Sequence, residues 1–391
     1  MSNNLQDYFE VGPSGTLTSF SSVAHLHQLL NAEQHVQVDK LREHARHGIA
    51  PKVRGEVWLY LLDVLSADKT SEITSLRGLN RKYQALSSSL PSDLTSLLLK
   101  TALAHHTHRF FSPTYADLIS SITAEPLEPV LPLNPVPTAA ASTKLPSAAP
   151  IVNGNTNPSP PTERDEPPEG EAAAMQRPQF LLPPPPDSPP SRHAYLSILE
   201  EVLGKHANSE EYCEARSRGR EWDYNHDDEK DWVYLATPFL CCLSRPVAVF
   251  LGFQNLMQKL DTFPPVPSRL ASLLTLFRFA LPELHSYFED EQVPFYEVAL
   301  CWLRTLLARE MWLGDVLRLW DAYLAADDMF ALHCYVCVAI LGTCKETLEE
   351  LDGSEAKLML LDLPPMDVDR LLQDAGNLKV AFPLPRPASP S

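Results

Sequence analysis

The chain has 391 residues, a formal net charge of −18 and 44% hydrophobic residues, enough apolar material for one large domain or two ordinary ones. The acidic balance argues against a general nucleic-acid binder and does not favour anionic membranes. The sequence does not open with a basic segment followed by an apolar run, and no apolar stretch approaches the roughly 18 residues of a membrane span. We therefore expect neither a secretory signal nor a transmembrane segment.

Apolar residues at three- and four-residue spacing predict helices along most of the chain. Before the middle of the chain the predicted helical segments are 23–47, 54–65, 94–103 and 115–122. Later ones are 193–206, 232–243, 246–260, 268–281, 295–309, 315–325 and 330–351. The alternation and hairpin turns typical of strands are not seen in the sequence, so we expect an all-α fold.

Proline separates the two helical parts, because residues 124–192 hold 19 of the chain's 36 prolines. Such a segment buries too little apolar surface to offset its ordering entropy, so we expect a disordered, partly polyproline-II insertion. Its expected role is that of a spacer. The alternative is a docking motif at Phe180–Leu182, which precedes four prolines and would suit domains that bind proline-rich sequences.

Three groups of residues suggest metal or redox chemistry, and each has a simpler explanation. The acidic segment Glu221–Asp231 lacks the spacing, central glycine and terminal glutamate of an EF-hand, so a solvated loop is expected. His105, His106 and His108 lie together without an Asp, Glu or Cys at metal spacing. The seven cysteines are odd in number and mostly lie in apolar helical contexts, which predicts reduced core thiols in the cytoplasm. They are Cys213, Cys241, Cys242, Cys301, Cys334, Cys337 and Cys344, and the Cys-x-x-Cys pair within them is expected to pack in the core.

The segment from Phe295 to Leu324 has the clearest pattern in the chain. It predicts two amphipathic helices joined by a short turn, with Gly314 and Asp315 placed to start the second helix. Its apolar positions are Phe295, Val298, Ala299, Trp302, Leu303, Leu306 and Leu307, followed by Leu313, Val316, Leu317, Trp320, Tyr323 and Leu324. Tryptophans on two facing stripes predict a tightly packed helical core.

Several motifs resemble the TBC domain, the family that activates Rab-type small GTPases. Gly48–Pro51 followed by Arg54–Trp58 is similar to the family's Gly-Ile-Pro-like turn and its Arg-x-x-x-Trp motif. Leu281–Leu284 is similar to its Leu-Pro-x-Leu motif, and further matches in order are Trp302, Arg318, Trp320 and Asp321. The resemblance implies a two-lobed helical fold in which these residues, with Arg54 and Trp58, are structural. An arginine near a helix start gains nothing from the helix dipole, so Arg54 is expected to have a specific partner.

The resemblance also implies a division of the chain into domains. The TBC domain would occupy residues 41–123 and 193–351, on either side of the disordered insertion 124–192. Residues 1–40 would be an N-terminal extension, and residues 352–391 a C-terminal helix with a disordered tail.

The family's catalytic arginine lies in an Ile-x-x-Asp-x-x-Arg motif, followed by a small residue, an aromatic residue and proline. The match is Leu103–Arg109 with Phe110–Pro113 after it, which implies that Arg109 is the arginine finger. His106 stands where the family has aspartate, and a histidine cannot be an anionic partner for a basic group. A competing alignment over Leu90–Ser96 keeps an aspartate but has serine in place of the arginine. We prefer Arg109 because the aromatic residue and proline follow it.

The third family motif is Tyr-x-Gln-Gly, whose glutamine replaces the water-orienting glutamine of the GTPase. Tyr212–Ala215 is its best match and puts Glu214 at the glutamine position, whereas alignment backwards from Pro238 puts Lys230 there. Neither alignment retains the glutamine. An ionised glutamate only accepts hydrogen bonds and brings negative charge towards the γ-phosphate, but an arginine finger alone still stabilises developing charge.

These resemblances imply a GTPase-activating protein for a Rab-family GTPase, which supplies Arg109 in trans and acts in vesicle trafficking. GTP and Mg²⁺ would belong to the partner, and the chain would bind no cofactor of its own. The alternative is a pseudo-GAP, a TBC scaffold that binds a GTPase or assembly partner without accelerating hydrolysis, which His106 and the missing glutamine favour. A metal-dependent hydrolase has little support. The expected location is the cytoplasm, with peripheral attachment to endomembranes through partners.

Overall fold

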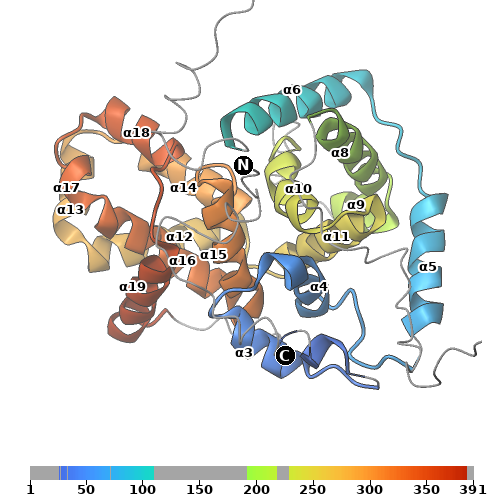
Figure 1. The fold of residues 1–391 in the computed structure, drawn as a ribbon. Helices are drawn as coiled ribbons and strands as arrows, with labels where there is room; N and C mark the ends of the chain where they lie inside the picture. The colour runs from blue at the N-terminus through green and yellow to red at the C-terminus, as the bar shows by residue number, and fades with distance from the viewer. Residues whose placement is uncertain are drawn as a thin grey trace, which may run out of the picture. The chain divides into compact units, whose positions relative to one another are not determined.

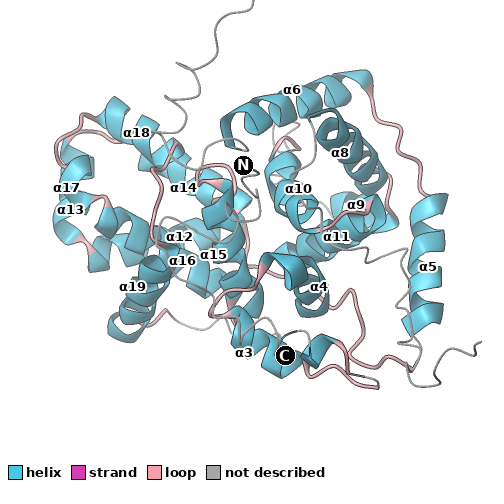
Figure 2. Cartoon of the chain, in the orientation of Figure 1, coloured by secondary structure: helices cyan, strands magenta, loops and turns pink. Residues whose placement is uncertain are grey.

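The computed structural model describes residues 26, 28–32, 34–70, 72–109, 192–217 and 229–384. Within these ranges the regular elements are α-helices (Figure 2). The only β-type pairing among the described residues is an isolated antiparallel bridge between His35 and Asp68. The all-α prediction is therefore confirmed. The predicted helix 115–122, the proline-rich insertion up to residue 191 and the tail from residue 385 lie outside the described residues.

Figure 1 shows the arrangement of the helices, whose bounds follow. They are α3 (Val38–Ala45), α4 (Pro51–Leu61), α5 (Glu72–Ala85), α6 (Ser92–Arg109), α8 (Arg192–Ala207), α9 (Glu210–Ser217), α10 (Asp231–Cys242), α11 (Pro246–Asp261), α12 (Val266–Ala280), α13 (Pro282–Asp290), α14 (Phe295–Thr305), α15 (Leu313–Ala325), α16 (Met329–Thr343), α17 (Lys345–Leu348), α18 (Gly353–Leu361) and α19 (Val368–Ala381). The first helices, α3 and α4, lie beside α15 from the far end of the sequence.

Every predicted helical segment within the described residues contains a helix, but α5, α9 and α13 are additional. The pattern of α5 is weak because only Leu76 and Tyr83 of its residues are buried. In α13 a proline occupies the first turn, where its missing N–H costs nothing. The segment after residue 351 holds two helices rather than the one expected.

The chain reverses sharply between α14 and α15. Leu306 and Leu307 both adopt left-handed backbone conformations, with φ of 51° and 64°. This ends α14 at Thr305, so the prediction of a helix through residue 309 is wrong. Both leucine side chains are nevertheless buried, and the Leu306 carbonyl accepts a hydrogen bond from Trp320 Nε1 at 3.3 Å. Burial of the two side chains and this hydrogen bond stabilise a left-handed backbone conformation that is unfavourable for leucine.

His333 joins α14, α15 and α16 in the core. Its Nε2 lies 3.0 Å from the carbonyl oxygen of Trp302, which only accepts, so Nε2 carries the proton. Its Nδ1 then accepts from the Tyr323 hydroxyl at 2.8 Å. Burial lowers the pKa of His333 to about 3, consistent with a neutral ring. Trp302 and Trp320 are fully buried, as the facing stripes predict.

The core extends beyond the boundaries expected at residues 40 and 351. Leu26, Leu30 and Val36 are buried, so part of the expected N-terminal extension belongs to the core. At the other end α19 packs along α16, and the Tyr335 hydroxyl donates to the Phe382 carbonyl at 2.9 Å. The seven cysteines are free, and Cys334 and Cys337 of the Cys-x-x-Cys pair are buried in the core as predicted, whereas Cys213 is exposed.

The connection between α5 and α6 is held on α8. Lys205 Nζ donates to the carbonyl oxygens of Tyr83 and Leu86 at 2.9 and 2.8 Å. Gly204 is required at this crossing, because a Cβ there would lie 2.1 Å from the carbonyl oxygen of Ser88. Helix α8 thus fixes the point from which α6 starts.

Candidate functional site

The most strongly connected polar group in the core is the carboxylate of Asp321 on α15, which is fully buried. Arg54 Nε on α4 donates to its two oxygens at 3.1 and 3.2 Å, and Trp58 Nε1 donates at 2.7 Å. The backbone N–H of Ile49 donates at 2.9 Å, and an Arg54 NH2 group bonds the Ile49 carbonyl at 2.8 Å. The partner expected for Arg54 is therefore Asp321.

The hydrogen bonds to Asp321 join the Arg-x-x-x-Trp motif of α4 to the motif on α15 that contains Trp320 and Asp321. Burial raises the pKa of Asp321, and the Arg54 charge and the N–H donors oppose that shift by favouring the carboxylate. The rings of Trp58, Trp320 and Phe239 pack against one another with centroids 5.6–6.0 Å apart. The arrangement stabilises the scaffold and leaves no face of the carboxylate open to a ligand.

Arg318 lies one turn before Asp321 on α15 and contacts the segment that connects α3 to α4. Its guanidinium bonds Asp369 of α19 at 2.6 and 3.0 Å and the Arg46 carbonyl at 3.0 Å. Gly48 has φ of 100°, and a Cβ there would lie 3.2 Å from Arg318 Nε. Glycine is therefore needed for both the backbone conformation and the close contact.

The arginine predicted to be the finger, Arg109, is the last residue of α6. The backbone of His106 is also helical, but the side chains of both residues lie outside those described. One turn earlier, His105 is buried and its ring meets the Tyr234 ring of α10 edge-on, with centroids 5.0 Å apart. The predicted finger thus lies just beyond a fixed contact between α6 and α10.

A cluster of charged groups surrounds the start of α10 and the turn after α14. The Arg309 guanidinium lies 5.9 Å from the centroid of the Tyr234 ring and donates to Cys301 Sγ at 3.3 Å. The neighbouring Glu310 is fully buried and accepts from the Thr305 hydroxyl at 3.1 Å. Burial raises the pKa of Glu310 to about 7.

The expectation of a solvated acidic loop is wrong at the C-terminal end of that segment. Glu229 and Asp231 are buried, and Arg304 bonds Asp231 at 2.7 Å. Glu229 accepts from the Tyr212 hydroxyl at 3.1 Å. The signal that sequence analysis missed is the acidic residue at the first position of an apolar helix, where the helix dipole favours it. The rest of the loop lies outside the described residues.

Glu214 is exposed on α9, two residues beyond the buried Tyr212. The Tyr212 ring packs edge-on against Trp232 at 5.1 Å and beside His206 at 5.2 Å. Burial lowers the pKa of His206 to about 3, and its ring nitrogens have no hydrogen-bond partner among the described residues. Lys230, the other residue aligned to the glutamine, follows Glu229 directly at the start of α10, so each candidate lies close in sequence to one partner of the Tyr212–Glu229 hydrogen bond.

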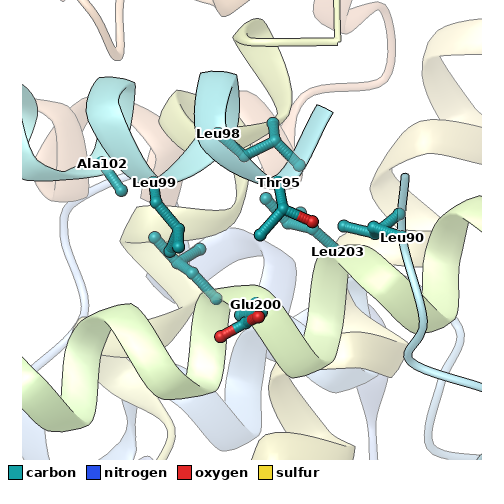
Figure 3. Close-up of a pocket in the computed structure, with 8 residues that line it drawn as sticks. Leu90, Thr95, Leu98, Leu99, Ala102, Glu200 and Leu203 are labelled. Carbon is teal, nitrogen blue, oxygen red and sulfur yellow. The ribbon is translucent and has the colours of Figure 1, made fainter. Parts of the chain in front are cut away.

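A small pocket between α6 and α8 contains none of the predicted site residues (Figure 3). It is lined by Leu90, Thr95, Leu98, Leu99, Ala102, Leu199, Glu200 and Leu203. These side chains are almost all apolar and offer no acid–base pair. Among the described residues there is also no group of three or more His, Cys, Asp or Glu placed to hold a metal ion.

Comparison with known proteins identifies the class of domain. The Rab-GTPase-TBC domain family model matches residues 229–349. The human TBC1 domain family member 22A is 38% identical over 107 residues, which cover 26% of this chain and 21% of that protein. The Schizosaccharomyces pombe GTPase-activating protein gyp1 is 28% identical over 86 residues, covering 22% of this chain and 17% of its own. The crystal structure of the Ypt/Rab-GAP domain of Gyp1p superposes with a TM-score of 0.53 at 17% identity, over 93% of this chain and 98% of that one.

The fold is therefore that of a Ypt/Rab-GAP domain, which confirms the resemblance seen in the motifs. Residues 229–349 are thus similar in sequence to the Rab-GTPase-TBC domain, and the fold as a whole is similar to that of the Gyp1p domain. Its matched region spans about a fifth of the length of the TBC1 relative. In the part of the chain that the structure describes, no helix is both long and apolar enough to cross a membrane.

Proposed function

We propose that this chain activates GTP hydrolysis by a Rab-family small GTPase, with Arg109 as an arginine finger supplied in trans. The observation that supports this most directly is the contact between His105 and Tyr234. It anchors the last turn of α6, one turn before Arg109, on the segment that matches the Rab-GTPase-TBC domain. The partner would carry GTP and Mg²⁺.

In this mechanism the guanidinium of Arg109 stabilises the charge that develops as the γ-phosphate leaves. Arginine fingers contribute roughly 10³–10⁵ in rate in related GTPase systems. Glu214 has no N–H to donate to the attacking water or to the phosphate. The water-orienting role therefore falls to the glutamine of the partner GTPase.

Single-turnover GTP hydrolysis across a panel of Rab proteins tests the proposal. We expect the wild-type chain to accelerate at least one Rab and Arg109→Ala to lower that acceleration roughly 10³-fold. Arg81→Ala, at an exposed position of α5, is the matched control and should retain activity. If the wild-type chain accelerates no Rab, or if Arg109→Ala is as active as the wild type, the proposal fails.

The position of the missing glutamine is tested in the same assay. Glu214→Gln restores a donor and removes a charge, so we expect it to raise the rate by roughly tenfold or more. Glu211→Gln, also exposed on α9, makes the same chemical change outside the motif and should have no effect. An unchanged rate for Glu214→Gln together with a raised rate for Lys230→Gln would show that Lys230, and not Glu214, occupies the glutamine position.

A second candidate function is a pseudo-GAP scaffold, favoured by His106 and Glu214 at two positions where the family has catalytic-motif residues. It predicts saturable binding of a GTP-loaded Rab without acceleration of hydrolysis. We further propose that the chain acts in the cytoplasm, reaching endomembranes through partners, with residues 124–192 as a spacer between its two helical parts.

A further inference from the structure

We propose that Tyr234 and Arg309 form a support that positions the last turn of α6, and through it the arginine finger. The inference rests on the proposed role of Arg109. It assigns a positioning function to two residues outside the three sequence motifs, and both lie within the matched segment 229–349.

The geometry begins at His105, the last residue of α6 whose side chain the structure describes. Its ring stands at 90° to the Tyr234 ring at a centroid distance of 5.0 Å. The helix ends four residues later at Arg109, so the backbone of the last turn follows directly on this contact. The contact with Tyr234 is thus the nearest described anchor to the finger.

Tyr234 is in turn held by the turn after α14. The Arg309 guanidinium lies 5.9 Å from the centroid of its ring, within the range of a cation–π interaction. Arg309 is fixed by its bond to Cys301 Sγ at 3.3 Å and lies with its Nε 4.0 Å from the buried Glu310 carboxylate. The backbone that carries it follows the two left-handed leucines, whose side chains are buried.

The last turn of a helix needs such support because its final carbonyl groups have no partners within the helix. An aromatic pair and a cation over a ring each shift an equilibrium by about three- to tenfold. That is enough to change markedly how often residues 103–109 are helical. A frayed last turn would present Arg109 in many orientations, which lowers kcat more than it weakens binding.

The test uses Tyr234→Ala, with Tyr234→Phe as the variant that keeps the ring. Tyr287→Ala is the matched control, because Tyr287 is also a half-buried tyrosine but lies on α13 and bonds the Leu351 carbonyl. Amide hydrogen exchange of residues 103–109 is measured on the chain alone. Stimulated hydrolysis then gives kcat and KM for a responsive Rab.

We expect Tyr234→Ala to speed exchange in residues 103–109 by about tenfold and to lower kcat by a similar factor, with KM within about twofold. Tyr234→Phe should behave as the wild type, and Tyr287→Ala should change neither quantity. Arg309→Met should shift both in the same direction as Tyr234→Ala but by less.

Equal exchange in Tyr234→Ala and Tyr287→Ala would overturn the proposal, as would faster exchange with an unchanged kcat. The exchange measurement needs no GTPase, so it decides the support of α6 by itself. If the wild-type chain activates no Rab, the proposed function fails. The amide exchange rates of residues 103–109 would still show whether Tyr234 supports the last turn of α6.

Discussion

Glu310 is a buried carboxyl group whose described side-chain donor is the Thr305 hydroxyl, at 3.1 Å. Burial raises its pKa from 4.5 to about 7, so the folded chain binds a proton that the unfolded chain releases. Its stabilising contribution is complete below about pH 4.5 and is lost as the pH rises through 7, a loss of about 3 kcal/mol. Glu310→Gln should therefore raise the free energy of unfolding at pH 8 and leave it nearly unchanged at pH 4.

Urea denaturation at the two pH values measures this effect. Glu43→Gln, at an exposed position of α3, is the control and should show no difference at either pH. If Glu310→Gln changed stability equally at pH 4 and pH 8, the buried carboxyl would not be the titrating group. His206 and His333 titrate in the opposite sense, because burial lowers the pKa of both, but their effect cancels between variants.

At the scale of elements, α4 and α15 are joined through the buried Arg54–Asp321 pair. Removing one partner leaves the other charged and buried, so Asp321→Ala should cost about 3–5 kcal/mol of unfolding free energy. A double-mutant cycle with Arg54→Met should give a combined loss well below the sum of the single losses. Equilibrium urea unfolding supplies all four values.

The Arg318–Asp369 pair is the matched comparison for that cycle. Asp369 is 39% exposed, so the coupling there should be about 1 kcal/mol or less. Additive losses at Arg54 and Asp321 would show that the two helices are not coupled through this pair.

At the scale of the whole molecule, the last two helices are part of the folding unit. The carbonyl of Leu360 accepts from Trp302 Nε1 at 3.0 Å, and α19 packs along α16. Truncation after Leu351 should therefore abolish the cooperative unfolding transition and the near-UV circular dichroism. Truncation after Leu384 keeps every described contact and should unfold like the full chain. A cooperative transition in the shorter protein would restore the boundary expected at residue 351.

The sequence predicted those parts of the fold that depend on local pattern. Trp302 and Trp320 were assigned to the core from helical spacing alone, and both are buried. The partner of Arg54 lies 267 residues away, and no local pattern could identify it. The end of α14 was missed because leucine gives no signal for the left-handed backbone that tertiary contacts impose at Leu306.

The candidate site is harder to predict than the scaffold, for a physical reason. A finger supplied in trans meets its chemical partners only in the complex, so packing within the chain does not mark it. The resemblance singled out Arg109 and Glu214, which stay predictions. Tyr234 lies outside the motifs, and its contact with His105 follows only from the way α6 crosses α10.

The paired helices α6 and α8 have one further consequence. They run side by side in opposite directions, with Ala102 of α6 and Leu199 of α8 lining the same pocket (Figure 3). From Ala102 to the end of α6 at Arg109 there are as many residues as from the start of α8 at Arg192 to Leu199. The end of α6 and the start of α8 therefore lie at the same edge of the helix pair. The two helices form an antiparallel pair whose connection, residues 110–191, is far longer than a turn. We therefore expect that new chain ends placed between Arg109 and Arg192 would leave the packing of α6 on α8 intact.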